Sequence, residues 1–181
     1  EIGKYDSAER LARRAVEIRV SMLGMRDPNT VAARCTLANV LLTSRKLSEG
    51  REIVRGIYRD IVEVGQTQTP DGMWARMSMA RIDDAEGNAE RSRIALEELA
   101  ADYRSSPFSG SMDRQNVLND LVLHYLRERK VDRAEAIQRE IVSFTTERLG
   151  PDDITTLNAT RTLVTLLRRG GKLDEAAGLN L

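Results

Sequence analysis

The feature that most constrains how this chain can fold is an internal repeat of 42 residues. The chain has 181 residues and contains four lysines, which all stand in one register. Lys4, Lys46, Lys130 and Lys172 are separated by one or two periods, and Asn88 occupies the remaining position of the series. A fixed period of this length is typical of arrays in which small structural units stack and bury their apolar faces against one another. The length corresponds to about 4.3 such units.

The residues around these positions repeat as well. The sequence reads Gly-Lys-Tyr-Asp-Ser-Ala-Glu at 3–9, Arg-Lys-Val-Asp-Arg-Ala-Glu at 129–135 and Gly-Lys-Leu-Asp-Glu-Ala-Ala at 171–177, with a looser copy at 45–51. Four positions after the lysine stands a small residue, namely Ala8, Gly50, Ala134 or Ala176. Small side chains at one phase predict a position where neighbouring helices leave no room for a larger group.

The apolar residues within each period have helical spacing. The stripes are Leu11, Ala15 and Ile18; Ile53, Ile57 and Ile61; and Ala134, Ile137 and Ile141. Intervals of three and four residues predict helices that pack on one side, so we expect each stripe to face inward. Turn residues stand in phase before every second helix, at Gly3, Arg45, Gly87, Arg129 and Gly171, and Pro28, Pro70, Pro107 and Pro151 lie in the junctions.

These signals together predict an all-α solenoid of antiparallel helix pairs. The first helices are expected at 29–43, 71–86, 113–128 and 155–169, and the second helices at 4–23, 46–64, 88–104, 130–148 and from 172 onward.

Composition and charge exclude several functional classes. Lys and Arg number 28, as do Asp and Glu, so the chain lacks the basic excess typical of proteins that bind nucleic acid or membrane surfaces. No apolar run is long enough for a membrane span. The single cysteine and single histidine, Cys35 and His124, are too few for an internal disulfide or the usual zinc sites. We expect a soluble, cytoplasmic protein without a cofactor.

The sequence offers little support for catalysis. Gly170-Gly171-Lys172 resembles a phosphate-binding loop in three letters only, and it follows a predicted helix rather than a strand. Cys35 has no histidine near it in sequence, and His124 is interpreted as a surface or seam residue of a helix. We therefore expect no enzymatic activity.

Two segments resemble a known family. Residues 118–130, Leu-Asn-Asp-Leu-Val-Leu-His-Tyr-Leu-Arg-Glu-Arg-Lys, with Arg-Ala-Glu at 133–135, resemble the 42-residue tetratricopeptide repeat of kinesin light chains, whose pattern is Leu-Asn-Asn-Leu-Ala-x-Leu-Tyr, Gly-Lys and Glu-Ala-Glu. Residues 149–157, Leu-Gly-Pro-Asp-Asp-Ile-Thr-Thr-Leu, are similar to the Leu-Gly-x-x-His-Pro-x-Thr-Leu junction of kinesin-light-chain-like arrays. The resemblance covers the whole chain. It implies a right-handed α-solenoid, a single array over 1–181 that we expect to be a fragment of a longer protein.

The chain departs from this family pattern in two places. Asp83 occupies the phase where the other periods carry Leu41, Tyr125 and Leu167, so we expect either that Asp83 is exposed or that its helix is rotated. Residues 104–112 replace the family junction with a small polar loop.

The resemblance also implies a candidate binding surface. In tetratricopeptide repeats the first helices line a concave wall that commonly holds an extended peptide. The family's groove-facing phases include Cys35 and Met77, and we select as peptide-binding candidates Asn39, Trp74, Arg81, Asn116, Asn119, Arg127, Arg161 and Arg168. Asn can donate to and accept from a ligand backbone and Arg can bind carboxylates, which favours an acidic peptide. The alternatives are an ordinary solvated surface and, for Trp74, packing in the core.

We therefore expect a protein-interaction scaffold with a protein or peptide partner, and neither nucleic acid nor a membrane as partner. A second hypothesis is a regulatory or sensor domain of a larger nucleotide-driven receptor or enzyme, which a Gly-x-x-x-x-Gly-Lys-Ser/Thr motif upstream would indicate. A third is weak self-association through uncapped ends of the array.

Overall fold

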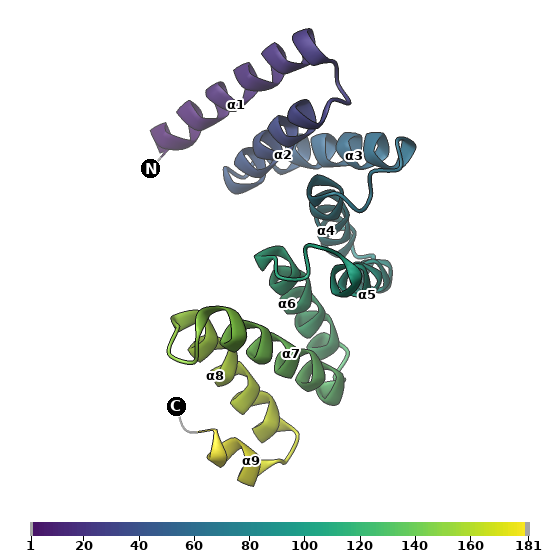
Figure 1. The fold of residues 1–181 in the computed structure, drawn as a ribbon. Helices are drawn as coiled ribbons and strands as arrows, with labels where there is room; N and C mark the ends of the chain where they lie inside the picture. The colour runs from purple at the N-terminus through teal and green to yellow at the C-terminus, as the bar shows by residue number, and fades with distance from the viewer. Residues whose placement is uncertain (1, 180–181) are drawn as a thin grey trace. The chain divides into compact units, whose positions relative to one another are not determined.

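The computed structural model describes residues 2–179, and this part of the chain forms nine α-helices and no strands (Figure 1). The helices are α1 (Ile2–Leu23), α2 (Pro28–Thr43), α3 (Leu47–Glu63), α4 (Pro70–Ala85), α5 (Ala89–Ser105), α6 (Met112–Arg127), α7 (Val131–Leu149), α8 (Ile154–Arg169) and α9 (Leu173–Gly178). The predicted all-α fold is confirmed, and the predicted helix ends agree with the observed ones to within two residues.

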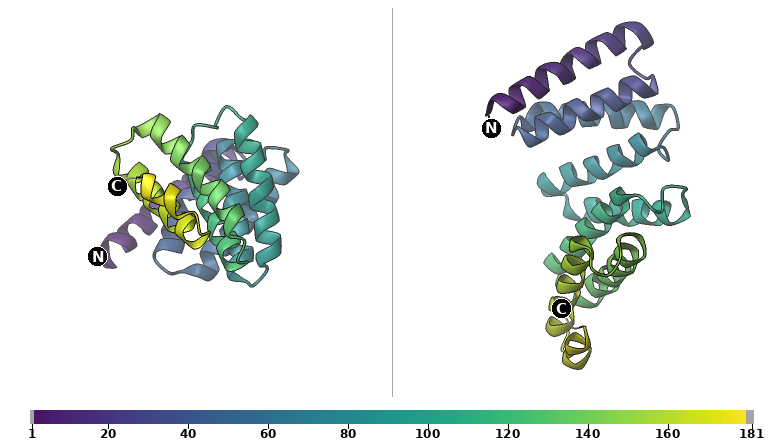
Figure 2. Two further views of the ribbon diagram at one scale, coloured as in Figure 1. Left: turned by 90° about the horizontal axis from the view of Figure 1, so that it is seen from below. Right: turned by 60° about the vertical axis from the view of Figure 1, so that its left-hand side comes forward.

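The helices form two compact units, Glu1–Asn88 with α1 to α4 and Ala89–Leu181 with α5 to α9. Within each unit every helix packs on the next one in sequence, and in the first unit α2 also packs on α4. Within a unit, successive helices run in opposite directions and are joined by short turns, as Figure 2 shows. Each unit is therefore built from the predicted antiparallel helix pairs. The single array over the whole chain remains a prediction.

A side chain caps the N-terminus of each first helix. The capping bonds run from the backbone N–H of Asn29 to Asp27, of Gly72 to Thr69, of Asp113 to Ser111 and of Thr155 to Asp153, at 2.7–3.1 Å. Oxygen acceptors at this position satisfy N–H groups that have no partner within the helix. Pro28 and Pro70 begin α2 and α4, where their missing N–H costs nothing.

The turns before α3, α5, α7 and α9 share one backbone conformation. The in-phase residue has a positive φ in all four, 64° at Arg45, 88° at Gly87, 58° at Arg129 and 77° at Gly171. The next residue then donates its N–H to the carbonyl five positions earlier, for example Lys130 to Tyr125 at 2.8 Å. This is the helix-ending geometry that a left-handed residue permits. Gly3, by contrast, lies inside α1 rather than in a turn.

The phase occupied by Asp83 is the buried seam between paired helices. Leu41 and Leu167 are fully buried there, Tyr125 is nearly so, and Asp83 itself is only 7% exposed. Neither of the two expectations for Asp83 is correct, because the helix keeps its register and the acid is enclosed with it. The seam of α4 thus differs from the others in polarity, not in geometry.

The inward face of α1 differs from the predicted stripe. Leu11 and Ile18 are 68% and 43% exposed, so the prediction that this stripe packs inward is wrong. Ala12 is buried instead and packs with Val16 against α2. The small residue, not the largest aliphatic one, fits the close approach of the two helices. In the predicted stripes of α3 and α7, Ile57, Ile61, Ala134 and Ile141 are buried, whereas Ile53 and Ile137 are half-buried.

Candidate functional site

A groove of about 420 Å³ lies over α7 between α6 and α8. Its lining consists of polar uncharged and apolar residues, namely Gln115, Asn119, Val122, Leu123, Gln138, Ile141, Thr155, Asn158, Ala159 and Thr162. The N-cap residues Ser111 and Asp153 fix where the two flanking helices, α6 and α8, begin. The lining therefore combines an apolar base with a set of hydrogen-bonding groups and carries no charge.

Four primary amides converge on this groove. Asn119 and Asn158 are exposed on α6 and α8, and Gln115 and Gln138 are buried beneath them. Gln138 donates its Nε2 to the carbonyl of Ala159 at 2.9 Å, which holds α7 to α8. The Oε1 of Gln115 is enclosed without a hydrogen-bond partner. Since each amide carries both donors and an acceptor, the set matches the alternating N–H and C=O groups of an extended backbone.

The structure distinguishes the candidates of the second unit from one another. Asn119 lines the groove, whereas Asn116 is exposed one turn earlier, with Nδ2 3.5 Å from Asp113. Arg161 donates to the Oδ1 of Asn158 at 3.0 Å. The remaining two arginine candidates, Arg127 and Arg168, are exposed in the last turns of α6 and α8.

Sequence reasoning missed the buried half of the lining. Gln115 lies beside the predicted phases, and Gln138 comes from a second helix, which the expectation of a wall made of first helices left out. A signal was present for Gln138, because it stands four residues after the small Ala134 and shares the inward face of that helix.

The candidates of the first unit are more dispersed. Asn39 and Arg81 are exposed on α2 and α4. Trp74 is half-buried and packs against two core clusters, one with Val31 and Ile57 and one with Ala38 and Val54. Its packing role, held open from the sequence, is therefore present in the structure.

Two groove-facing expectations in the first unit are wrong. Cys35 and Met77 are buried, and Cys35 belongs to the core cluster with Val31 and Ile57. Burial raises the pKa of the Cys35 thiol to about 12. The thiol is therefore protonated at neutral pH and not a nucleophile.

Two of the recurring lysines form ion pairs between second helices. Lys46 bonds Glu9 at 2.7 Å, and Lys172 bonds Glu135 at 2.8 Å. Both carboxylates also accept from an arginine one turn later, Arg13 and Arg139. The hydrogen bond from Lys172 is the main reason why the pKa of Glu135 is lowered, and Lys46 acts likewise on Glu9. Lys46 thus ties α3 to α1 and Lys172 ties α9 to α7, whereas Lys130 pairs with Glu128 of its own turn.

His124 occupies a helix seam. It is buried, and its Nε2 lies 3.1 Å from the Oγ of Ser92, which is fully buried. Across residues 2–179 no group of His, Cys, Asp and Glu side chains is arranged to hold a metal ion. The helices of this part of the chain also include none with the length and apolar character needed to cross a bilayer.

No protein-family model and no curated protein matches the chain. Solved structures do. A Podosopora anserina protein described as a kinesin light chain with nearly identical TPR-like repeats superposes with a TM-score of 0.73 at 19% identity, covering 98% of this chain and 84% of that one, and a single-substitution variant of it scores 0.74. BtubC (BKLC) from P. vanneervenii superposes with a TM-score of 0.73 at 17% identity, covering 97% of this chain and 70% of that one.

These likenesses show that the chain has the fold of kinesin-light-chain-like tetratricopeptide repeats. The resemblance expected from the sequence is thereby confirmed at the level of fold.

Proposed function

We propose that this chain is a protein-interaction scaffold that binds an extended peptide segment of a partner in the groove between α6 and α8. The observation that carries the proposal is the lining of that groove, in which four primary amides surround an uncharged, partly apolar floor. Such a lining can hold a backbone by paired hydrogen bonds and accept small apolar side chains. The enclosed, unpartnered Oε1 of Gln115 adds an acceptor that a ligand N–H would satisfy.

The arginines of the same helices favour an acidic partner segment. Arg127, Arg161 and Arg168 lie outside the lining and are exposed, so they act on a ligand through their field more than through direct contacts. Exposed charges of this kind raise association rates and lose their effect as salt is added. The amides would therefore determine how long the peptide stays bound, and the arginines how fast it arrives.

A random peptide library selected on the wild-type protein tests the proposal. For a selected peptide, Asn119→Ala should raise the dissociation rate by about tenfold, because a buried hydrogen bond to the ligand is lost. Arg161→Ala should mainly lower the association rate and its dependence on salt.

Asn116→Ala is the matched control, since it removes the same side chain one turn earlier on α6 but outside the groove lining. It should leave dissociation nearly unchanged. Recovery of the same peptides with the same affinities by wild type and by Asn119→Ala/Arg161→Ala would refute the groove as the binding site.

A further inference from the structure

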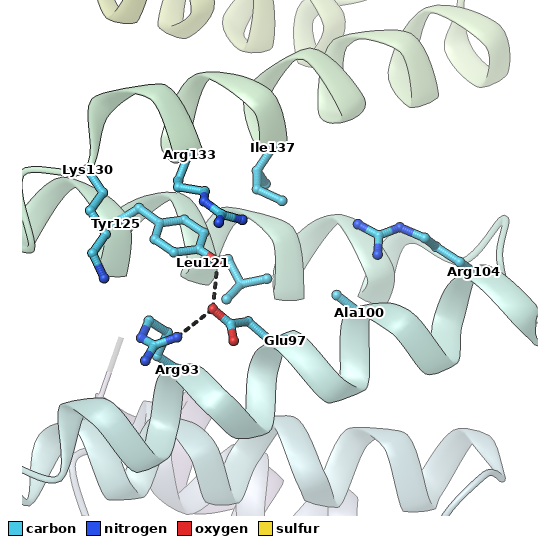
Figure 3. Close-up of a pocket in the computed structure, with 9 residues that line it drawn as sticks. All are labelled: Arg93, Glu97, Ala100, Arg104, Leu121, Tyr125, Lys130, Arg133 and Ile137. Atoms are coloured by element: carbon cyan, nitrogen blue, oxygen red, sulfur yellow. Dashed lines mark hydrogen bonds and ion pairs between the residues drawn. The ribbon is translucent and has the colours of Figure 1, made fainter.

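A second hollow, of about 470 Å³, lies between α5 and α7, which are second helices of their pairs, and over the first helix α6 (Figure 3). Its base is apolar and consists of Ala100, Leu121 and Ile137 together with the ring of Tyr125. Cationic side chains surround this base, namely Arg93, Arg104, Lys130 and Arg133. The hollow differs from the uncharged groove in both its location and its chemistry.

The other periods of the chain carry different charges at the positions that flank this hollow. In the first and fourth periods an ion pair of 2.6 Å spans consecutive second helices, joining Arg13 to Glu49 and Arg139 to Glu175. In the third period the same positions carry Glu97 and Arg133, so the charges are reversed. This reversed pair does not close, because Glu97 accepts from the Tyr125 hydroxyl and from Arg93, both at 2.6 Å.

The reversal leaves Arg133 without a hydrogen bond or ion pair, although its charge helps to lower the pKa of Glu97. Its guanidinium makes no hydrogen bond or ion pair with any residue of 2–179. Figure 3 shows the side chain reaching from α7 into the hollow beside Tyr125. A guanidinium that faces an apolar base offers a fixed pair of donors to a carboxylate.

The floor of the hollow is also enlarged in this period alone. Ala100 stands where the other three periods carry Val16, Tyr58 and Val142. The smaller side chain, itself buried, removes volume that the sister positions fill. The third period therefore combines an unpaired cation with an enlarged apolar floor.

The charge count specifies the ligand further. Arg93 is paired with Glu97, Lys130 with Glu128, and Arg104 with Glu140. Glu128 also pairs with Arg93 and Glu140 also pairs with Arg114, so these carboxylates are already shared, and Arg133 is the lining cation that pairs with none of them. A single negative charge balances it, whereas a dianion would have to compete with the carboxylates already bound.

We propose that this hollow binds a small organic monocarboxylate with an apolar body. The carboxylate pairs with Arg133, and the apolar body covers Ala100, Leu121 and Ile137. The ligand thereby supplies the bridge between α5 and α7 that Arg13 and Arg139 provide in the sister periods. This inference does not depend on the peptide groove, which uses other residues.

The probe is 4-phenylbutanoate, titrated into ¹⁵N-labelled protein and followed by amide chemical shifts. We expect saturable shifts in α5 and α7 with a dissociation constant of about 1 mM, as suits a ligand of this size. The neutral 4-phenylbutanamide, of the same shape, should bind about tenfold more weakly or not at all. Phenyl phosphate, a dianion with the same ring, should bind no more tightly than the acid.

Two variants test the two parts of the site, and one serves as control. Arg133→Gln removes the unpaired charge and Ala100→Val refills the floor as in the sister periods; each should weaken binding by about tenfold. Arg169→Gln removes an exposed cation outside the hollow and should bind like wild type. Because Arg133 makes no hydrogen bond or ion pair and acts on Glu97 only through its charge, its variant should melt close to the wild-type temperature, which separates lost binding from lost folding.

Three results would overturn the proposal. They are an amide that binds as well as the acid, an Arg133→Gln variant that retains wild-type affinity, and the absence of saturable binding up to about 10 mM. Tighter binding of phenyl phosphate would likewise contradict the assignment of a single negative charge.

Discussion

Glu135 shows at the scale of one residue how the periods are joined. Its side chain is 5% exposed and accepts hydrogen bonds from both Lys172 and Arg139. Glu135→Gln keeps the shape but removes the charge, so we expect a loss of about 1–3 kcal/mol in the free energy of unfolding at pH 7. Glu98→Gln, an exposed carboxylate on α5, is the matched control and should change little.

The stability difference between wild type and Glu135→Gln should depend on pH. The pKa of Glu135 is lowered in the folded protein, chiefly by the Lys172 hydrogen bond. Its contribution is therefore fully present above about pH 4.3, the pKa of an unfolded Glu, and is lost as the pH falls through the lowered value. The stability difference between wild type and Glu135→Gln should shrink in urea titrations at successively lower acid pH. A difference that stays constant down to about pH 2 would contradict this linkage.

Two substitutions in the turns separate backbone strain from packing at the scale of an element. A Cβ added at Gly171 would meet no atom within 4 Å, so the cost of Gly171→Ala comes from the left-handed backbone alone, about 1 kcal/mol. Arg129 already bears this cost at a φ of 58°, so Arg129→Gly should be neutral or stabilising by up to about 1 kcal/mol. Melting temperatures that shift in the same direction for both would show that these turns are not strained.

A substitution at the small-residue position of the repeat should cost more stability than the substitutions in the turns. Ala134 is fully buried at the small-residue position of α7. Ala134→Leu should cost about 1–3 kcal/mol because the neighbouring helices leave no space for the added groups. An unchanged melting curve would show that the register of the repeat is wrong.

The sequence predicted the helices well because their ends carry local signals. The turn residue at Arg129 and the cap at Asp153 act through the nearest backbone groups, so their position alone predicts where a helix ends. The inward face of α1 was not predictable in this way. It carries two apolar stripes, and the choice of Ala12 over Leu11 depends on how closely α2 approaches, which is a tertiary property.

The residues of the candidate site were likewise predicted only in part from the sequence. Asn119 followed from the repeat phase, because its position on α6 is set by local helix geometry. Gln115 and Gln138 did not follow, because the groove extends down to α7 and its depth depends on the packing of three helices. The reversed charges at Glu97 and Arg133 were readable in the sequence, but only the structure shows that Glu97 bonds Tyr125 instead.

The first unit exposes an apolar stripe that bears on the behaviour of the whole molecule. Leu11, Ile18 and Met22 lie on one face of α1 and are exposed. We expect this surface to produce weak, concentration-dependent association, since exposed apolar patches favour contacts that cover them. Ile18→Glu should reduce the association seen in a sedimentation series. A wild-type protein that stays monomeric up to about 1 mM would contradict the expectation.

We propose that the uncharged groove holds a peptide backbone through its side-chain amides. These amides can be observed directly, because the NH₂ groups of Asn and Gln give their own signals in a ¹H–¹⁵N spectrum. On titration with a library-selected peptide, the signals of Gln115, Asn119, Gln138 and Asn158 should move and saturate together, while that of Asn116 stays in place. Saturable binding that leaves these four signals unmoved, or that moves signals on other helices instead, would contradict the account.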